Sequence, residues 1–335
     1  MERLILQSIW IPGVAGLFCI ILMRTKVGEA FLDAIRKIIM FVVSAYCIYL
    51  GWMFFSTGSG TAPLGTITLG TLSTRMLLKV NVFGGLMILF TGIFGFLVAI
   101  YSMKYRSKAM HNNWYYGLCL WILASANGVF LAGDLFTLVI FWELSTLFLF
   151  GLIALGNNER TAFAAAKTLI ILGLAETGML FAVAYIWVTQ GTLVIGEISL
   201  GLSSSINILL YLLIAAAGIA KAGGIPLHSW IPTASEGAPT SVMAFLPASI
   251  DKLMGIFFLF IVSYNIFVIQ ASLKLVLMII GVVTIIIAVL MAMLQHNLKK
   301  LLAYHAVSQV GYMLSLIHIS EPTRPLYISY AVFCL

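Results

Sequence analysis

Apolar stretches of about 20 residues recur nine times along this chain, and no other feature constrains its fold as strongly. An α-helix rises about 1.5 Å per residue, so a stretch of that length crosses a hydrocarbon core of about 30 Å. The chain is 62% hydrophobic and 9% charged, whereas about a quarter of the residues in a soluble domain are charged. We therefore predict an all-α fold, a polytopic transmembrane helical bundle. The predicted spans are residues 4–23, 34–55, 81–103, 115–133, 135–155, 162–187, 206–232, 241–264 and 268–293, and a tenth begins near residue 301.

Positively charged residues concentrate in the links that follow odd-numbered spans. Ten lie in those links or in the span ends that follow them, and three lie in the links after even-numbered spans or in the span ends that follow those. Because cytoplasmic links carry the excess of Lys and Arg, we predict a multi-pass protein of the cell's inner (plasma) membrane with its N-terminus outside. The net charge of +7 then reflects orientation in the membrane, and no nucleic-acid partner is expected. The links at 56–80 and 191–205 are rich in Gly, Ser and Thr and are predicted to be loops.

The sequence shows no signature of a cofactor or metal site. Its four cysteines have no CxxC spacing and no histidine partners, which argues against a metal site and a disulfide framework. It has no GxGxxG or P-loop motif, and no pair of histidines placed at mid-depth on two spans for haem. We therefore expect no metal, no cofactor and no redox site of its own in this chain.

Six further acidic residues or lysines nevertheless fall inside the apolar spans: Glu143, Lys167, Glu176, Lys221, Asp251 and Lys252. A charge at mid-bilayer costs at least about 2.5–3.5 kcal/mol, so each of them needs a reason. Glu143 and Lys252 lie near the middle of their spans. Lys221 immediately precedes the sequence Gly223-Gly224-Ile225-Pro226, which is predicted to break its helix because proline removes a backbone donor. These three residues are the predicted proton pathway, and Gly223, Gly224 and Pro226 are the predicted helix break.

Five further residues have competing interpretations. Lys167 lies close to a span end, where its ammonium group either reaches the headgroups or serves a channel. Glu176 is nine positions from Lys167, hence on the opposite helix face, and a structural pairing with another helix is favoured for it. Asp251 either joins the pathway or satisfies a neighbouring polar group. His228 and His305 either relay protons or make packing contacts.

The end of the chain departs from this pattern. Residues 314–324 (LSLIHISEPTR) and 328–335 (ISYAVFCL) resemble a translated sequencing adapter. Pro322 and Pro325 would stop a helix at a depth where a span should still be apolar. We therefore expect residues 314–335 to be a non-native tail, and the natural protein to continue beyond Met313 with further spans.

Four motifs connect the chain to a known family. They are FWEL at 141–144, GIAKAGGIPLHSWIP at 218–232, SEGAPT at 235–240 and LKKLLAYHAVSQVGYM at 298–313. Together they resemble the antiporter-like subunits of respiratory complex I, of Mrp-type cation/proton antiporters and of energy-converting hydrogenases. The resemblance covers roughly residues 80–313.

The resemblance implies inverted five-helix repeats, each with a broken helix, and a charged axis at mid-membrane. It divides the chain into three N-terminal helices (1–114), a first repeat (115–264) and the truncated start of a second repeat (265–313), followed by the tail (314–335). Carried over residue by residue, it makes Glu143 a pairing glutamate, Lys221 the lysine beside the break and Lys252 a connecting lysine.

The sequence is compatible with three functions. The first is a proton-translocating subunit of a complex-I-like NADH:quinone oxidoreductase or of a membrane-bound hydrogenase complex, acting through a Glu/Lys relay. The second is a subunit of a multisubunit Na⁺/H⁺ antiporter of the Mrp type. The third is a non-transporting membrane scaffold, against which the intact Glu143, Lys221 and Lys252 argue. The expected partners are other membrane and peripheral subunits, protons or Na⁺, and the lipid bilayer.

Overall fold

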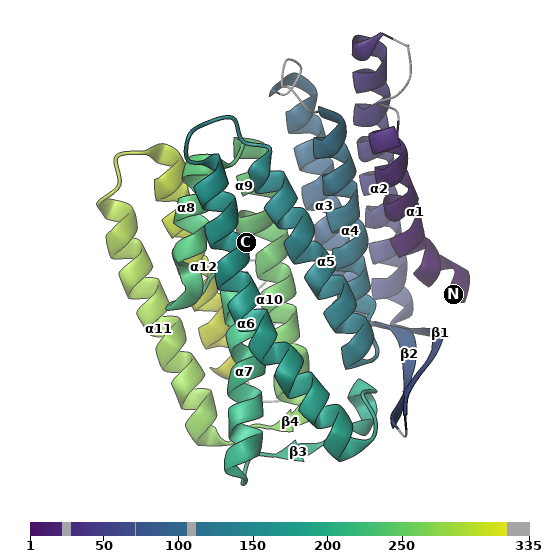
Figure 1. The fold of residues 1–335 in the computed structure, drawn as a ribbon, viewed down its shortest axis with the longest axis vertical. Coiled ribbons are helices and arrows are strands. Elements are labelled where there is room, and N and C mark those ends of the chain that lie inside the picture. Colours follow the sequence, from purple (N-terminus) through teal and green to yellow (C-terminus); the bar gives the residue numbers. More distant parts are fainter. Residues whose placement is uncertain (22–27, 71, 106–111, 320–335) are drawn as a thin grey trace. The chain divides into compact units, whose positions relative to one another are not determined.

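A computed structural model describes residues 1–21, 28–70, 72–105 and 112–319 (Figure 1). The chain forms two compact units. Unit 1 comprises Met1–Gly156 and Gly191–Val194, and unit 2 comprises Asn157–Gln190 and Ile195–Leu335.

Unit 1 is a bundle of five helices with a hairpin at one end. α2 packs along α3, α1 packs along α4, and α4 also packs against α5. Its elements are α1 (Glu2–Ile21), α2 (Glu29–Thr57), β1 (Ser59–Leu69), β2 (Leu72–Asn81), α3 (Val82–Tyr105), α4 (Asn112–Leu131) and α5 (Leu135–Ala154).

The surroundings of a proline inside α1 show how this apolar bundle satisfies the hydrogen-bonding groups of its backbone. Pro12 has no N–H, so the carbonyl of Ser8, four residues earlier, loses its usual helical donor. Asn127 of α4 replaces that donor, with its Nδ2 at 2.8 Å from the Ser8 carbonyl oxygen. Trp121, also on α4, donates its indole N–H to the Gly13 carbonyl at 3.0 Å. The Asn127 side chain thus compensates for the proline, and Trp121 adds a hydrogen bond to the neighbouring backbone, in keeping with a membrane interior that offers no other partners.

The hairpin corrects the prediction of a loop at residues 56–80. β1 and β2 pair antiparallel from Ser59 and Asn81 to Leu69 and Leu72. Leu78 and Val80 are buried on one face of β2, whereas Lys79 between them is exposed. This alternation is the signal of a half-buried strand, which the many Gly, Ser and Thr residues of the segment had obscured.

Unit 2 contains the interrupted helices. α7 packs against α6 and α10, α12 packs against α8, and α11 forms an antiparallel pair with α12 (Figure 1). Its elements are α6 (Thr161–Gln190), η2 (Ile195–Glu197), β3 (Leu200–Gly201), α7 (Ser205–Ala222), η3 (Leu227–Ser229), α8 (Trp230–Gly237), α9 (Thr240–Phe245), η4 (Leu246–Ile250), α10 (Asp251–Ile261), η5 (Val262–Ile266), β4 (Phe267–Val268), α11 (Ala271–Met293) and α12 (Leu298–Ile319).

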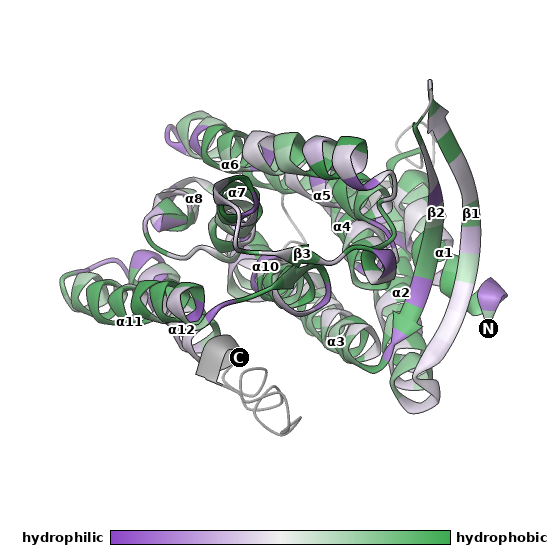
Figure 2. Ribbon diagram, turned by 90° about the horizontal axis from the view of Figure 1, so that it is seen from below, coloured by the Kyte–Doolittle hydropathy of each residue, from purple (hydrophilic) through white to green (hydrophobic). Residues whose placement is uncertain are grey.

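The predicted fold class and spans are confirmed over the described part of the chain. Nine helical segments there are long and apolar enough to cross a membrane, and each coincides with a predicted span to within a few residues. α11 has an exposed apolar surface, as expected of a membrane span, because Ile279, Ile286 and Leu290 are all more than half exposed on it. Figure 2 shows the same hydrophobic exterior along α11. The chain is thus a multi-pass membrane protein.

The end of α12 differs from the expectation for the tail. We expected native helix only as far as Met313, yet α12 runs on to Ile319, and Leu314 is fully buried in unit 2. The apolar LSLI sequence is compatible with a helix whatever its origin. Residues 320–335 lie outside the described part of the chain. The division into repeats at 115–264 and 265–313 remains a prediction.

Asp134 fixes the start of α5, nine residues before Glu143. It is the N-cap residue, and its Oδ1 accepts a hydrogen bond of 2.8 Å from the Thr137 N–H. Its Oδ2 accepts a second bond of 2.8 Å from the Leu77 N–H of β2. The side chain is fully buried, and burial raises the pKa of Asp134 above its ordinary value of 3.8, although these N–H donors act in the opposite direction.

We predict that Asp134→Ala lowers the stability of the protein by about 0.5–2 kcal/mol, the usual loss for an N-cap, and that Asp134→Asn costs less. Because the folded-state pKa is raised, the folded state binds more protons than the unfolded state just above pH 3.8, and stability falls as pH rises through that window. Thermal midpoints of the detergent-solubilised protein at several pH values test this. Asp134→Asn should remove that part of the decline; identical pH profiles for wild type and Asp134→Asn would contradict the prediction.

Candidate functional site

The helix that carries Lys221 ends where the sequence predicts. Gly223 has a φ of +89°, a left-handed conformation that favours glycine. The Gly223 N–H bonds the Ala220 carbonyl at 3.1 Å, and the Gly224 N–H bonds the Ile219 carbonyl at 2.8 Å. This pair of bonds is a Schellman motif, which closes the C-terminus of α7. Lys221 therefore sits in the last turn of α7, where a cation is favoured by the helix dipole.

The backbone groups released by the break are taken up by neighbouring helices. The Ala220 carbonyl also accepts the indole N–H of Trp230, at 2.9 Å. The Ile225 N–H donates to the hydroxyl of Thr284 on α11, at 3.2 Å. Non-helical backbone at membrane depth is tolerated only where it is satisfied in this way. The break is thus a built feature of unit 2, held by α8 and α11.

Lys221 is buried beside two carboxylates. Its Nζ lies 3.8 Å from Oε1 of Glu176 on α6, and the two side chains are 0% and 3% exposed. Asp251, the first residue of α10, is 1% exposed and interacts electrostatically with both Lys221 and Glu176. When all three groups are ionised, the cluster carries one net negative charge. Uptake of one proton makes it neutral, so the cluster is chemically suited to hold a transferable proton.

Small residues bring α10 close enough to α7 for this cluster to form. A Cβ atom on Gly255 would lie 2.6 Å from the Gly218 carbonyl oxygen and 2.7 Å from the Ala222 nitrogen, so only glycine fits there. Gly218 and Ala222 are four residues apart and form the small-residue surface that such close helix contacts use. Asp251 precedes Gly255 by four residues and shares its face of α10. The glycine contact therefore aims Asp251 at α7.

A second interruption lies immediately before Asp251. We predicted a continuous span at 241–264, but the structure has a π-helical segment, η4, between α9 and α10. Pro247 inside η4 is the signal that the prediction neglected. Segments of π-helix within α-helices frequently mark functional sites.

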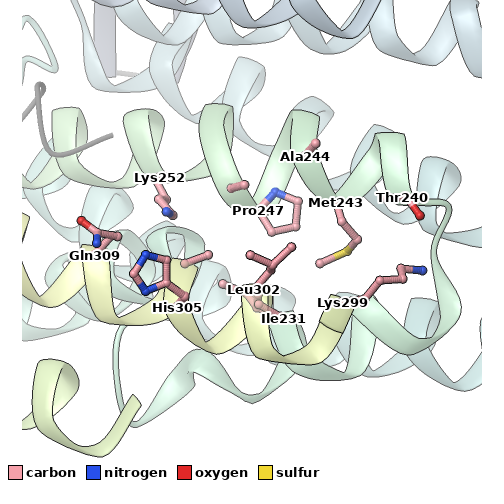
Figure 3. Close-up of a pocket in the computed structure, with 13 residues that line it drawn as sticks. Ile231, Thr240, Met243, Ala244, Pro247, Lys252, Lys299, Leu302, His305 and Gln309 are labelled. Carbon is pink, nitrogen blue, oxygen red and sulfur yellow. The ribbon is translucent and has the colours of Figure 1, made fainter. Parts of the chain in front are cut away.

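Lys252 faces a cavity, away from the cluster that Asp251 joins. The cavity has a volume of about 340 Å³ and lies within unit 2, between α12 and the segment α9–η4–α10 (Figure 3). Lys252 is 3% exposed, and its ammonium group makes no hydrogen bond or ion pair with any residue that the structure describes. The lining residues are Ile231, Thr240, Met243, Ala244, Pro247, Ala248, Lys252, Lys299, Leu302, Ala303, His305, Ala306 and Gln309.

Glu236, at the end of α8, forms ion pairs with residues at the beginnings of α6 and α12. Its carboxylate pairs with Arg160 and lies 2.8 Å from the Lys300 ammonium. Lys299 donates to the Ala238 carbonyl at 2.8 Å, and burial lowers the pKa of Lys299. Glu236 was not among the residues predicted from the sequence. Its place in the SEGAPT motif, on the same predicted side of the membrane as Lys299 and Lys300, was the available signal.

Three other candidates have definite surroundings. Lys167 donates from α6 to the hydroxyl of Thr233 on α8, at 2.9 Å, so its ammonium group has an internal partner. The His228 ring lies 6.4 Å from the ring of Tyr304, centre to centre, and its Nδ1 has no hydrogen-bond partner among the described residues. Glu143 lies in the third turn of α5, in unit 1. Its pairing with Lys221 therefore remains a prediction, whereas Glu176 and Asp251 are the carboxylates that the structure places near Lys221.

Comparison with known proteins gives a consistent family. Residues 132–332 match the family described as NADH:quinone oxidoreductase/Mrp antiporter, TM. The D subunit of a Na⁺/H⁺ antiporter from Alkalihalophilus pseudofirmus is 26% identical over 327 residues, which cover 93% of this chain and 63% of that protein. The N subunit of the NADH-quinone oxidoreductase from Desulforudis audaxviator is 31% identical over 243 residues, covering 69% of this chain and 47% of that protein. The chain thus spans less than two thirds of these relatives.

Solved structures share the fold. A chain of the membrane-bound sulfane sulfur reductase (MBS), an archaeal respiratory membrane complex, superposes with a TM-score of 0.83 at 22% identity, covering 98% of this chain and 67% of that one. A chain of the Mrp complex from Dietzia sp. DQ12-45-1b gives a TM-score of 0.84 at 21% identity, covering 99% and 61%.

We predict that Lys221 and Glu176 are energetically coupled. Lys221→Met strands two buried carboxylates, and Glu176→Gln removes one of them, so the double variant should lose less stability than the two single losses added together. A coupling of about 0.5–3 kcal/mol is typical of residues in contact. Unfolding of the purified protein in mixed micelles measures it. Lys167→Met combined with Glu176→Gln is the matched control, since these residues lie on opposite faces of α6, and should be additive. Additivity of the Lys221 pair would contradict the prediction.

Proposed function

We propose that this chain moves protons through the membrane as one subunit of a larger energy-converting complex. The premise is its family: the chain belongs to the NADH:quinone oxidoreductase/Mrp antiporter transmembrane subunits. The observation that supports this most strongly is the buried cluster of Lys221, Glu176 and Asp251 beside the broken end of α7. Ionisable groups inside a membrane are costly, and they are retained where ions or protons pass.

The proposed mechanism is a relay between charged side chains. Lys221 holds its proton while a carboxylate lies near it, and burial favours loss of the proton when that carboxylate turns away. Glu176 and Asp251 are the carboxylates near Lys221 in unit 2. Glu143 would be a further partner, as the family resemblance implies, and Lys252 would receive the proton. The redox chemistry of such a complex would belong to other subunits, which drive this one through coupled charges and helix shifts.

We also propose the type of complex, its partners and the orientation of the chain in the membrane. The complex is a complex-I-like oxidoreductase or a membrane-bound hydrogenase, and the partners are its other membrane and peripheral subunits. The chain lies in the cell's inner membrane with its N-terminus outside, which is the orientation that the loop charges support.

A Na⁺/H⁺ antiporter is the second candidate, favoured by one observation. Similarity to the D subunit of the antiporter extends over 93% of this chain, further than the similarity to the N subunit of the oxidoreductase. The genes beside this one would separate the two candidates, since dehydrogenase or hydrogenase subunits support the first and small antiporter subunits the second. A non-transporting scaffold would have no use for three buried ionisable groups that interact electrostatically.

We predict that Lys221→Ala in the complete protein abolishes proton translocation while the complex remains assembled, because no other ammonium group of the cluster can replace it. Proton uptake into vesicles that contain the reconstituted complex measures the first effect, and co-purification of the other subunits measures the second.

The control for this experiment is the double variant Lys221→Ala/Glu176→Gln, in which one stranded carboxylate is removed and folding is less compromised. It should assemble and still fail to move protons. Lys167→Ala, a lysine of α6 outside the cluster, should retain most of the activity. Proton uptake at the unmutated rate in assembled Lys221→Ala would refute the proposed function of the site.

A further inference from the structure

We infer that Glu236 is a positioning residue for the proposed proton transfer at Lys221. Glu236 fixes the C-terminal end of α8, and the N-terminal end of α8 in turn holds the broken end of α7, next to Lys221. Glu236 therefore acts on Lys221 through the short helix between them. This inference deepens the proposed function and rests on it, since it assumes a chain that moves protons through the site of Lys221.

α8 is too short to hold its own position. It has eight residues, Trp230–Gly237, and helices of fewer than about 12 residues are marginal without packing partners. It packs against α6 on one side and α12 on the other (Figure 2). Its place in unit 2 therefore depends on the contacts that its two ends make with neighbouring helices.

The carbonyl groups at the C-terminal end of α8 are taken up by residues at or just before the starts of α6 and α12. Three side chains donate hydrogen bonds to consecutive carbonyls there: Asn158 to Glu236 at 2.9 Å, Thr161 to Gly237 at 3.0 Å, and Lys299 to Ala238 at 2.8 Å. Carbonyls at a helix end have no donor within the helix, so these bonds satisfy them. We call these contacts, together with the ion pairs of Glu236, the C-terminal anchor of α8.

The Glu236 carboxylate supplies the negative charge of this anchor. It pairs with Arg160 and lies 2.8 Å from the Lys300 ammonium. The Arg160 side chain is 70% exposed, so its pair contributes little alone, whereas the Glu236 and Lys300 side chains are 21% and 30% exposed. Lys299 adds a third positive charge at the end of α8. Loss of the carboxylate would leave three cations that repel one another, and the anchor would loosen.

The N-terminal end of α8 contacts the break in α7. Trp230, its first residue, is fully buried and donates its indole N–H to the Ala220 carbonyl at 2.9 Å. Ile231 packs against the left-handed turn, because a Cβ atom at Gly223 would lie 2.0 Å from its Cδ1. Ala220 precedes Lys221 and Gly223 follows it, so α8 touches the chain on both sides of the lysine. A shift of α8 must therefore disturb the last turn of α7.

The charges around Lys221 make its position matter for proton transfer. Its ammonium lies 3.8 Å from Glu176 of α6, and Asp251 of α10 also interacts with it. Glu236 is the one charged residue of α8 and lies at the other end of that helix. Because Coulomb energy falls with separation, a movement of the α7 end away from these carboxylates weakens the hold of Lys221 on its proton. The anchor thereby influences the proton site as well as the packing of α8.

The pH dependence of proton uptake by the complete complex in liposomes tests this inference. We expect Glu236→Gln to assemble and to lower the initial rate about three- to tenfold, within the range for residues that act through a packed network. The alkaline limb of its pH profile should move to lower pH by about 0.5 unit or more, which is roughly a threefold loss of proton affinity. Glu236→Asp, which keeps the charge, should be intermediate.

The matched control is Glu159→Gln. It removes an exposed carboxylate on the same predicted side of the membrane, one residue from Arg160, and thus makes the same change in charge without touching α8. Its rate and its pH profile should be those of the wild type.

A double-variant cycle tests the route through α8. Trp230→Phe removes the indole donor but keeps an aromatic ring in the buried position. If Glu236 acts through this contact, Glu236→Gln should change the rate by about twofold or less in the Trp230→Phe background. Hydrogen–deuterium exchange gives a readout that does not require proton movement: exchange over residues 223–238 should be faster in Glu236→Gln and unchanged in Glu159→Gln.

The outcomes separate this inference from the proposed function. A wild-type rate and pH profile in Glu236→Gln, with Lys221→Ala inactive, would overturn the inference and leave the proposed function standing. A lower rate with an unmoved profile, or losses in Glu236→Gln and Trp230→Phe that multiply, would also overturn it, because Glu236 would then be structural only.

A second variant covers a failure of Glu236→Gln to assemble. Lys300→Gln removes the less exposed partner of Glu236 and leaves Arg160, so it should change the rate and the profile in the same direction but less, and a wild-type profile would equally overturn the inference. A wild-type complex that moves no protons would refute the proposed function and this inference together, even if the exchange data confirmed the anchor.

Discussion

The pairing of Lys221 with buried carboxylates is the interaction on which the rest of unit 2 depends. A single ammonium group at 0% exposure would be strongly destabilising, so its partners must reach it from other helices. Glu176 does so from α6, and Asp251 does so from α10 because Gly255 allows that helix to touch the backbone of α7. The charge pairing at the site therefore requires the close packing of α10 on α7, since a larger residue at position 255 would separate the charges as well as the helices.

The break after Lys221 also stabilises its buried charge. By ending α7 at Ala222, it places the ammonium group at the negative end of a helix dipole and leaves polar backbone inside the membrane. That backbone is satisfied by Trp230 and Thr284, which belong to α8 and α11. The helices around the break are consequently fixed by specific hydrogen bonds, and a movement of the backbone at the broken end of α7 must exchange these bonds for others, including bonds to water.

The sequence predicted what depends on long local patterns and missed what depends on tertiary packing. The nine spans are recognisable because about 20 apolar residues in succession have few alternatives. The break was predictable because Gly223 and Pro226 act on their own segment. The β1–β2 hairpin was missed, because its alternation is short and lies among Gly and Ser. The pairing of Lys221 with Glu176 could not be assigned, since it depends on how α6 and α7 are rotated against each other, and the same holds for the partners of Glu236.

Two adjacent residues of one helix connect the cluster with the cavity. Asp251 faces Lys221 and Glu176, and Lys252, one position further and about 100° around the helix, faces the cavity. At an effective dielectric constant of about 20, two unit charges interact by about 4 kcal/mol at 4 Å, and the interaction energy falls in inverse proportion to their separation. In the proposed mechanism, a proton that neutralises the cluster therefore weakens the attraction that keeps Lys252 charged, so the charge states of the two sites depend on each other. Neighbouring positions in the sequence thereby couple two proton sites without any large movement of the helix.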